Sequence, residues 1–284
     1  MKALFLPVVG LPNVGKSTLI NSLLGKKVSI VTHKPHTTRS LITTNDKHEG
    51  YEVFFIDTPG IEKVKTKLGR VIYDSMCEYV DDAESLLLVL DANNPSLNYF
   101  EKIISKSVVV INKVDAIRKP KLLPLIDELY KKGAKEIFMI SAKTGDGLEA
   151  LKDFLKITAE SEEEVPSFGE FHEDIVSYAC ECVREKILVQ ADEEVPYNIL
   201  IEPVKARVPL NSAWHISLKI IVPKESYKPI LIGKKGSFLK AIGTAVRLEL
   251  SAKLKQPGFL NLQVSCQPKL WELDSTYQKL GWDK

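Results

Sequence analysis

Residues 10–17 read Gly-Leu-Pro-Asn-Val-Gly-Lys-Ser and match GxxxxGK[ST], the pattern that most restricts what this chain can fold into. An apolar run over 3–9 precedes the pattern, and a helical stretch over 18–24 follows it. Between a strand and a helix, this pattern forms a phosphate-binding loop, because glycine lets backbone N–H groups point inward and the helix N-terminus adds partial positive charge. We expect a nucleotide to contact Gly10, Leu11, Pro12, Asn13, Val14, Gly15, Lys16, Ser17 and Thr18.

Further apolar runs indicate the sheet that carries this loop. They cover residues 51–56, 86–90, 108–111 and 136–140, and helical stretches separate them. Such spacing is typical of a parallel sheet that is buried on both faces and covered by helices on both sides. The sequence therefore predicts an α/β domain of the P-loop NTPase class over residues 1–160.

Magnesium ligands are expected beside the loop. The lysine of such a loop binds the β- and γ-phosphates, and the hydroxyl that follows it binds magnesium, here Lys16 and Ser17. Asp57, Thr58, Pro59 and Gly60 end the strand over 51–56, where Asp57 can hold magnesium through water and Gly60 can bring its N–H to the γ-phosphate. In the polar stretch between them we expect Thr38 to be the second hydroxyl ligand, with Thr37 as the alternative.

The base is read by two segments that follow later strands. Asn112-Lys113-Val114-Asp115 comes after the run ending at 111, and Ser141-Ala142-Lys143 comes after the next. A carboxylate at Asp115 can accept hydrogen bonds from guanine N1–H and its exocyclic amine, whereas adenine has no such donor pair. The stem of Lys113 can lie along the base, and the backbone at 141–143 can donate to the guanine carbonyl. We therefore expect GTP and GDP rather than ATP, and a Ras-like GTPase domain.

The second half has a different pattern. We expect an acidic linker over 161–169, and then a helix (170–190), two strands (197–207 and 214–222), two helices (227–232 and 237–253) and a strand (259–265). This α-β-β-α-α-β order predicts an α+β type II KH domain over 170–284, with a C-terminal extension. The loop Gly233-Lys-Lys-Gly236 between its two central helices has the GxxG spacing with which KH domains clamp single-stranded nucleic acid. We expect RNA to contact Ile232, Gly233, Lys234, Lys235, Gly236, Ser237 and Lys240, with bases on an apolar groove of Ile230, Ile232, Ile242 and Val264.

Charge distribution supports this interpretation more than total charge does. The net charge is only +2, but residues 219–255 contain nine basic and two acidic side chains. The four cysteines have no metal-binding spacing and are expected to be reduced, buried thiols. Since no apolar run reaches the roughly 18–20 residues that span a bilayer, we expect a cytoplasmic protein.

The whole chain resembles the Era family of GTPases. The residues that carry the resemblance are Pro12-Asn13-Val14 in the loop, His36-Thr37-Thr38-Arg39, Asp57-Thr-Pro-Gly60 followed by Ile61, Lys67-Leu-Gly-Arg70, the segments at 112–115 and 141–145, and the KH loop. The resemblance implies slow hydrolysis of GTP to GDP, since Ile61 stands where Ras-like GTPases have a water-positioning glutamine. It also implies binding to the 3′ end of 16S ribosomal RNA in small ribosomal subunit assembly. Leu11 in place of a basic residue, a short 91–107 segment and Ser265–Pro268 depart from the family pattern.

Several alternatives stay open on the sequence. Asn13 either binds potassium that accelerates hydrolysis or only shapes the loop. The chain is either an assembly GTPase or an RNA-binding module in which GTP is a structural ligand with negligible turnover. We expect a monomer, either free in the cytoplasm or in peripheral contact with the inner face of the cell membrane.

Overall fold

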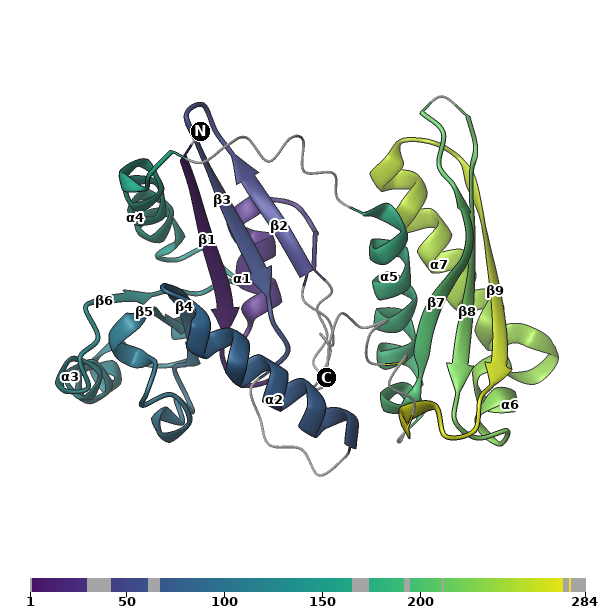
Figure 1. Ribbon diagram of the computed structural model, residues 1–284, viewed down its shortest axis with the longest axis horizontal. Helices are drawn as coiled ribbons and strands as arrows, with labels where there is room; N and C mark the ends of the chain where they lie inside the picture. Colours follow the sequence, from purple (N-terminus) through teal and green to yellow (C-terminus); the bar gives the residue numbers. More distant parts are fainter. Residues whose placement is uncertain are drawn as a thin grey trace. The chain divides into compact units, whose positions relative to one another are not determined.

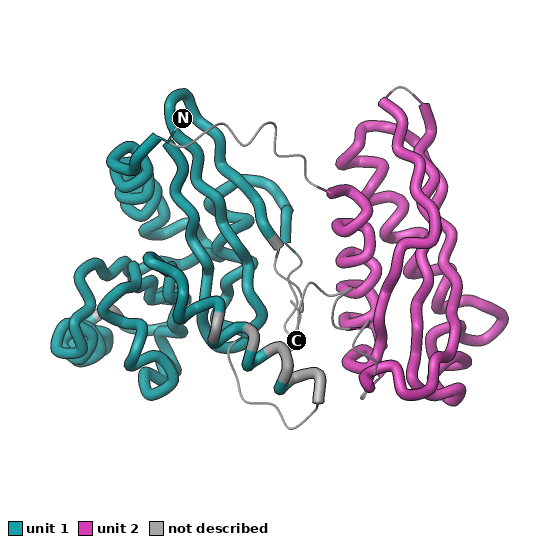
Figure 2. The backbone as a smooth tube through the Cα atoms, viewed as in Figure 1, with its two compact units in different colours: residues 1–171, 280–284 teal, residues 172–279 magenta. Residues whose placement is uncertain are grey.

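The computed structural model describes residues 2–29, 42–60, 67–164, 174–191, 195–210, 212–272 and 276. The chain divides into two compact units whose main boundary falls between Phe171 and His172 (Figure 2). The predicted linker, 161–169, falls partly outside the described residues. The division into a GTPase domain (1–160), this linker and a KH domain (170–284) therefore stays a prediction. Each unit is described by itself.

A six-stranded sheet forms the centre of the first unit, in the order β2-β3-β1-β4-β5-β6 (Figure 1). Its strands are β1 (Lys2–Val9), β2 (Ile42–Lys47), β3 (Tyr51–Asp57), β4 (Leu86–Asp91), β5 (Ser107–Asn112) and β6 (Glu136–Met139). The predicted strands are confirmed, and β1, β3, β4, β5 and β6 are parallel.

The two edges of this sheet differ from the prediction of an all-parallel sheet buried on both faces. Strand β2 pairs antiparallel with β3 and was not predicted, because its sequence ITTNDK is polar. At the other edge β6 is partly exposed, and it ends at Met139, one residue before the predicted end of its apolar run. An edge strand needs no continuous apolar run, since only one side of it is covered by another strand.

Four helices of the first unit are α1 (Lys16–Leu24), α2 (Lys67–Asp82), α3 (Leu123–Lys131) and α4 (Leu148–Ser161). Helix α1 begins two residues before its predicted start. Leu19, Ile20 and Leu23 of α1 share one core cluster with Leu151 and Leu155 of α4 and the side chains of β1 and β3. In Figure 1 α1 lies behind the sheet and α2 in front of it, so helices cover both faces as predicted. Short 3₁₀ turns lie at Leu97–Tyr99, Ile104–Lys106, Val114–Ala116 and Lys119–Leu122.

The second unit has the predicted α-β-β-α-α-β order. Its elements are α5 (Ile175–Gln190), β7 (Leu200–Arg207), β8 (Trp214–Val222), α6 (Tyr227–Ile232), α7 (Ser237–Leu254) and β9 (Gly258–Cys266), with 3₁₀ turns at Val195–Asn198, Lys234–Gly236 and Leu270–Glu272. Strand β8 lies between β7, which is antiparallel to it, and β9, which is parallel. Strand β7 begins at 200 rather than 197, because residues 195–198 form a turn.

Alternation along β8 builds the core of this unit. Trp214, Ile216, Leu218, Ile220 and Val222 are all buried and pack with residues of α5 and α7. Helix α5 begins after Asp174, whose carboxylate accepts a hydrogen bond from the Val176 N–H at 2.9 Å. The predicted start at 170 lies outside the described residues. No helix among the described residues is long and apolar enough to cross a membrane.

The cysteines carry no disulfide in the described chain, as expected of reduced thiols. Only Cys182 is buried, whereas Cys77, Cys180 and Cys266 are half-buried, so the expectation of four buried thiols was wrong for three of them.

Candidate functional site

Two glycines let the loop at residues 10–15 approach neighbouring strands closely. Gly10 has φ +154°, and a Cβ there would lie 2.3 Å from the Val89 carbonyl oxygen. Gly15 caps α1 with φ +98°, and a Cβ there would lie 2.4 Å from Nδ2 of Asn112. Larger residues at either position would therefore displace the loop from β4 or β5. Asn13, with φ 63°, also lies in the left-handed region, and its side chain is exposed.

Lys16 lies buried beneath the loop. Its Nζ donates to the carbonyl oxygens of Gly10 and Leu11, each at 3.0 Å. Burial lowers the pKa of Lys16 from 10.5 to about 8, and the nearby carboxylate of Asp57 opposes that shift. The loop thus holds a desolvated cation that a polyphosphate would stabilise.

Side chains from two separate segments meet beside Lys16. The Ser17 hydroxyl donates to Oδ2 of Asp57 at 2.6 Å, although the two residues are 40 positions apart in the sequence. The carboxylate of Asp57 is fully buried. A hydroxyl and a carboxylate are oxygen ligands of the kind that magnesium prefers, so these residues fit the predicted metal.

The segment after Asp57 is fixed against the loop. The Thr58 hydroxyl donates to the Val8 carbonyl at 2.7 Å, and Gly60 packs so closely on Pro12 that a Cβ would lie 2.6 Å from the Pro12 nitrogen. Pro59 lies buried between them. Thr37, Thr38 and Ile61 lie outside the described residues.

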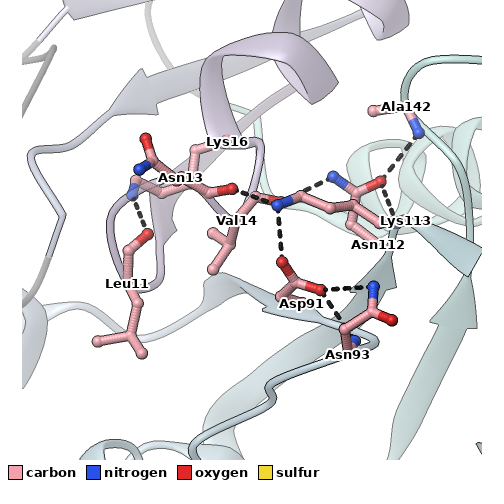
Figure 3. A network of polar contacts seen from close by, with 9 residues as sticks. All are labelled: Leu11, Asn13, Val14, Lys16, Asp91, Asn93, Asn112, Lys113 and Ala142. Atoms are coloured by element: carbon pink, nitrogen blue, oxygen red, sulfur yellow. Dashed lines mark hydrogen bonds and ion pairs between the residues drawn. The ribbon is translucent and has the colours of Figure 1, made fainter. Parts of the chain in front are cut away.

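Asn112 links the phosphate loop to the second base-reading segment (Figure 3). Its Nδ2 donates to the Val14 carbonyl at 2.8 Å, and its Oδ1 accepts from the backbone N–H groups of Lys113 at 2.8 Å and Ala142 at 2.9 Å. Asn112 is only 2% exposed. The Asn112 amide group thus makes its hydrogen bonds to other parts of the protein. We infer that it holds the phosphate loop and the second base-reading segment in fixed positions relative to each other.

Lys113 makes a second link across the site. Its Nζ donates to the Asn13 carbonyl at 2.5 Å and forms an ion pair with Asp91 at 2.6 Å (Figure 3). Burial raises the pKa of Asp91, but hydrogen bonds from Lys113 and the backbone of Asn93 outweigh burial and hold that pKa below its ordinary value. Sequence reasoning missed Asp91, although it follows the apolar run 86–90 as Asp57 and Asn112 follow theirs.

The remaining base-reading residues lie at the same edge. Asp115 is exposed within the turn Val114–Ala116, which is anchored by a hydrogen bond from the Val114 N–H to the Ile140 carbonyl at 3.1 Å. Ser141 and Ala142 are buried, and Lys143 is exposed. The Ser22 hydroxyl of α1 donates to the Ala142 carbonyl at 2.6 Å, a contact that no sequence motif indicates.

The predicted RNA loop joins α6 to α7. Gly233, with φ +74°, lies so close to Phe238 that a Cβ would be 2.7 Å from its backbone nitrogen, whereas Gly236, with φ +77°, faces open space. The side chains of Lys234, Lys235, Ser237 and Lys240 are exposed at this surface, and Ile232 is half-buried. The expected apolar groove is partly wrong: Ile242 is 0% exposed and belongs to the core, while Ile230 is 49% exposed.

The fold and the site together define a P-loop GTPase domain followed by a KH domain. Residues 6–113 match the family model described as 50S ribosome-binding GTPase, and residues 194–268 match the KH domain model. The GTPase Era of Ruminiclostridium cellulolyticum is 35% identical over 99% of this chain and 97% of that protein. The chain belongs to the Era family of GTPases, as its motifs indicated.

Solved structures agree with this assignment. The crystal structure of a point variant of Aquifex aeolicus Era bound to GDP·AlF4⁻ covers 100% of both chains at 34% identity, with a TM-score of 0.86. A structure of Era in complex with MgGDPNP and nucleotides 1506–1542 of 16S ribosomal RNA matches with the same coverage, identity and TM-score.

Proposed function

We propose that this chain binds GTP with magnesium, hydrolyses it to GDP, and binds the 3′ end of 16S ribosomal RNA during assembly of the small ribosomal subunit. The observation that best supports the nucleotide part is the set of hydrogen bonds at Asn112, which joins the phosphate loop to both base-reading segments. A ligand that contacts both the phosphate loop and the base-reading segments has a polyphosphate and a guanine base.

Each part of the nucleotide has its own residues in this proposal. Lys16 binds the β- and γ-phosphates, and Ser17 and Asp57 hold magnesium, with Thr38 as a further ligand. Magnesium, when bound, neutralises charge on the phosphates. Asp115 accepts the two donors of guanine, and the backbone from Ser141 to Lys143 binds its carbonyl. Titration with GTP and ATP tests this assignment, and equal affinity for the two nucleotides would contradict it.

Hydrolysis is proposed to be slow without a partner, because the isoleucine at position 61 cannot orient water by hydrogen bonding. We propose that potassium bound at Asn13 partly compensates. The Asn13 carbonyl accepts a hydrogen bond from Lys113, whereas its side chain is exposed beside the loop. Single-turnover hydrolysis in potassium and in sodium buffers tests this role, and equal rates would eliminate it.

RNA binding is proposed to occur at Gly233–Gly236. The two glycines permit close approach of a sugar–phosphate backbone, and Lys234 and Lys235 supply charge at the surface. The related Era structure that contains 16S ribosomal RNA nucleotides supports this choice of RNA. Replacing both lysines by aspartate should abolish binding of an RNA with the 3′-terminal 16S sequence and leave GTP affinity unchanged.

We further propose that the GTP-bound and GDP-bound states differ in affinity for this RNA, so that hydrolysis times its release. Identical RNA affinities with GDPNP and GDP would contradict this coupling. If hydrolysis stayed negligible with and without small ribosomal subunits, GTP would instead be a structural ligand.

The remaining proposals concern location and assembly. We propose a cytoplasmic monomer that acts on the small ribosomal subunit, with peripheral membrane contact as the alternative. Sedimentation of the protein with ribosomal subunits rather than with vesicles of anionic lipid would support the first.

A further inference from the structure

Among the described residues of the second unit, the helices leave one face of the three-stranded sheet uncovered at the end where His215 and Phe259 lie. Along β8 the buried residues Trp214, Ile216 and Leu218 point to α5 and α7, so the alternating residues His215 and Lys219 point to the opposite side. We call this opposite side the outer sheet face and define it by Lys205 and Arg207 of β7, His215 and Lys219 of β8, and Phe259 and Asn261 of β9.

An aromatic pair lies at one end of the outer sheet face. In the sheet register Arg207 is opposite His215, and His215 is opposite Phe259. The His215 and Phe259 rings are stacked, with centroids 5.0 Å apart and planes at 22°. Phe259 is nevertheless 63% exposed. Exposed aromatic rings on a sheet, with a guanidinium beside them, form the kind of surface on which unpaired bases stack.

The charge of the face fits a polyanion. Three of its six defining side chains, Lys205, Arg207 and Lys219, are cationic. Asn261 adds an exposed amide that can hydrogen-bond to a base edge. One carboxylate of β7, that of Glu202, lies on the same side of the sheet as these cations and is opposite Lys219 in the sheet register. A single strand of RNA offers both the phosphates and the unstacked bases that such a surface would bind.

The order of α7 and β9 in the chain places the aromatic pair far from the KH loop. Its residues Leu262 and Val264 pack toward the helices, while Phe259 and Asn261 point outward. The KH loop precedes α7 and β9 follows it, so the loop and Phe259 lie at opposite ends of this 18-residue helix, which is about 27 Å long. The roughly four nucleotides held by a KH loop therefore cannot also occupy the stacked pair, which requires a longer RNA.

We propose that the outer sheet face is a second site for single-stranded RNA, which binds nucleotides beyond those held at Gly233–Gly236. The proposal rests on the proposed RNA binding at that loop. It adds a stacking site at His215 and Phe259 and phosphate contacts at Lys205, Arg207 and Lys219.

The test compares two RNAs and three forms of the full-length protein with GDPNP. The short RNA is a single strand of about six nucleotides that fills only the KH loop, and the long RNA extends the same sequence by about 12 unpaired nucleotides on each side. The double variant Phe259→Ala, Arg207→Ala removes the stack and one cation. The matched control, Leu248→Ala with Arg247→Ala, removes an exposed apolar residue and an exposed arginine from α7. Thermal unfolding of each form confirms the fold.

We expect the wild-type protein to bind the long RNA about tenfold more tightly than the short one, in keeping with one or two stacked bases. The sheet variant should lose that tenfold gain and bind the short RNA as wild type does, while the control keeps it. An absent gain in wild type, or equal weakening of both RNAs in the sheet variant, would overturn the second site. Failure of the wild type to bind either RNA would instead refute the proposed function at the KH loop.

Discussion

Asn112 offers the sharpest test of how the nucleotide site is held together. Asn112→Ala removes three hydrogen bonds, to Val14, Lys113 and Ala142, at a side chain that is 2% exposed. At about 1 kcal/mol for each bond, the first unit should lose about 3 kcal/mol of its free energy of unfolding. With a urea dependence of about 2 kcal/mol per M, the midpoint should fall by about 1.5 M.

The positions of the tryptophans allow the two units to be followed separately. Trp214 and Trp271 belong to the second unit, so fluorescence reports that unit when all variants also carry Trp282→Phe. Far-UV circular dichroism reports both units, and only its transition should move in Asn112→Ala. The matched control is Asn93→Ala, which removes an exposed side chain with one 3.4 Å bond to Asp91. If both variants unfold at the same urea concentration, Asn112 is not the structural link described above.

Three further variants test the site. The pKa of Lys16 is about 8 in the folded chain and 10.5 ordinarily. Between these two pH values the folded state binds fewer protons than the unfolded state. The unfolding free energy of the ligand-free protein should therefore rise from about pH 8 to about pH 10. Lys16→Met should flatten that rise in urea denaturation, and an unchanged slope would contradict burial of the charge. Asp115→Asn should weaken GTP binding by about a hundredfold or more and favour xanthosine triphosphate in competition titrations, since an amide offers one donor and one acceptor. Gly60→Ala should weaken GTP binding by about tenfold, because its Cβ would lie 2.6 Å from the Pro12 nitrogen, and normal affinity would show that the two segments separate easily.

The sequence predicts those parts of the fold that depend on burial. Continuous apolar runs identify β4 and β5 because both strands lie inside the sheet, whereas the polar β2 forms through pairing with β3 alone. In the second unit β8 and α6 have the predicted limits, since turn residues bound them on both sides.

Some site residues can likewise be predicted from the sequence, whereas others depend on tertiary packing. Motif spacing identifies Lys16 and Ser17. It cannot indicate that Asp91 pairs with Lys113, because tertiary packing brings the last residue of β4 next to the residue that follows β5. Ile242 shows the converse error. It is apolar and near the KH loop in sequence, yet helical geometry turns it into the core.

Strand β9 has a consequence for how this family can vary in length. Its alternate residues serve the core on one side and the outer sheet face on the other, so one inserted residue in the turn at 255–257 would exchange the two sets. Leu260, Leu262 and Val264 would then face solvent, and Phe259 would take the core position of Leu260, opposite Ile216. We therefore expect homologues to keep the length of this turn unchanged, while the connection between β4 and β5 tolerates insertions and deletions.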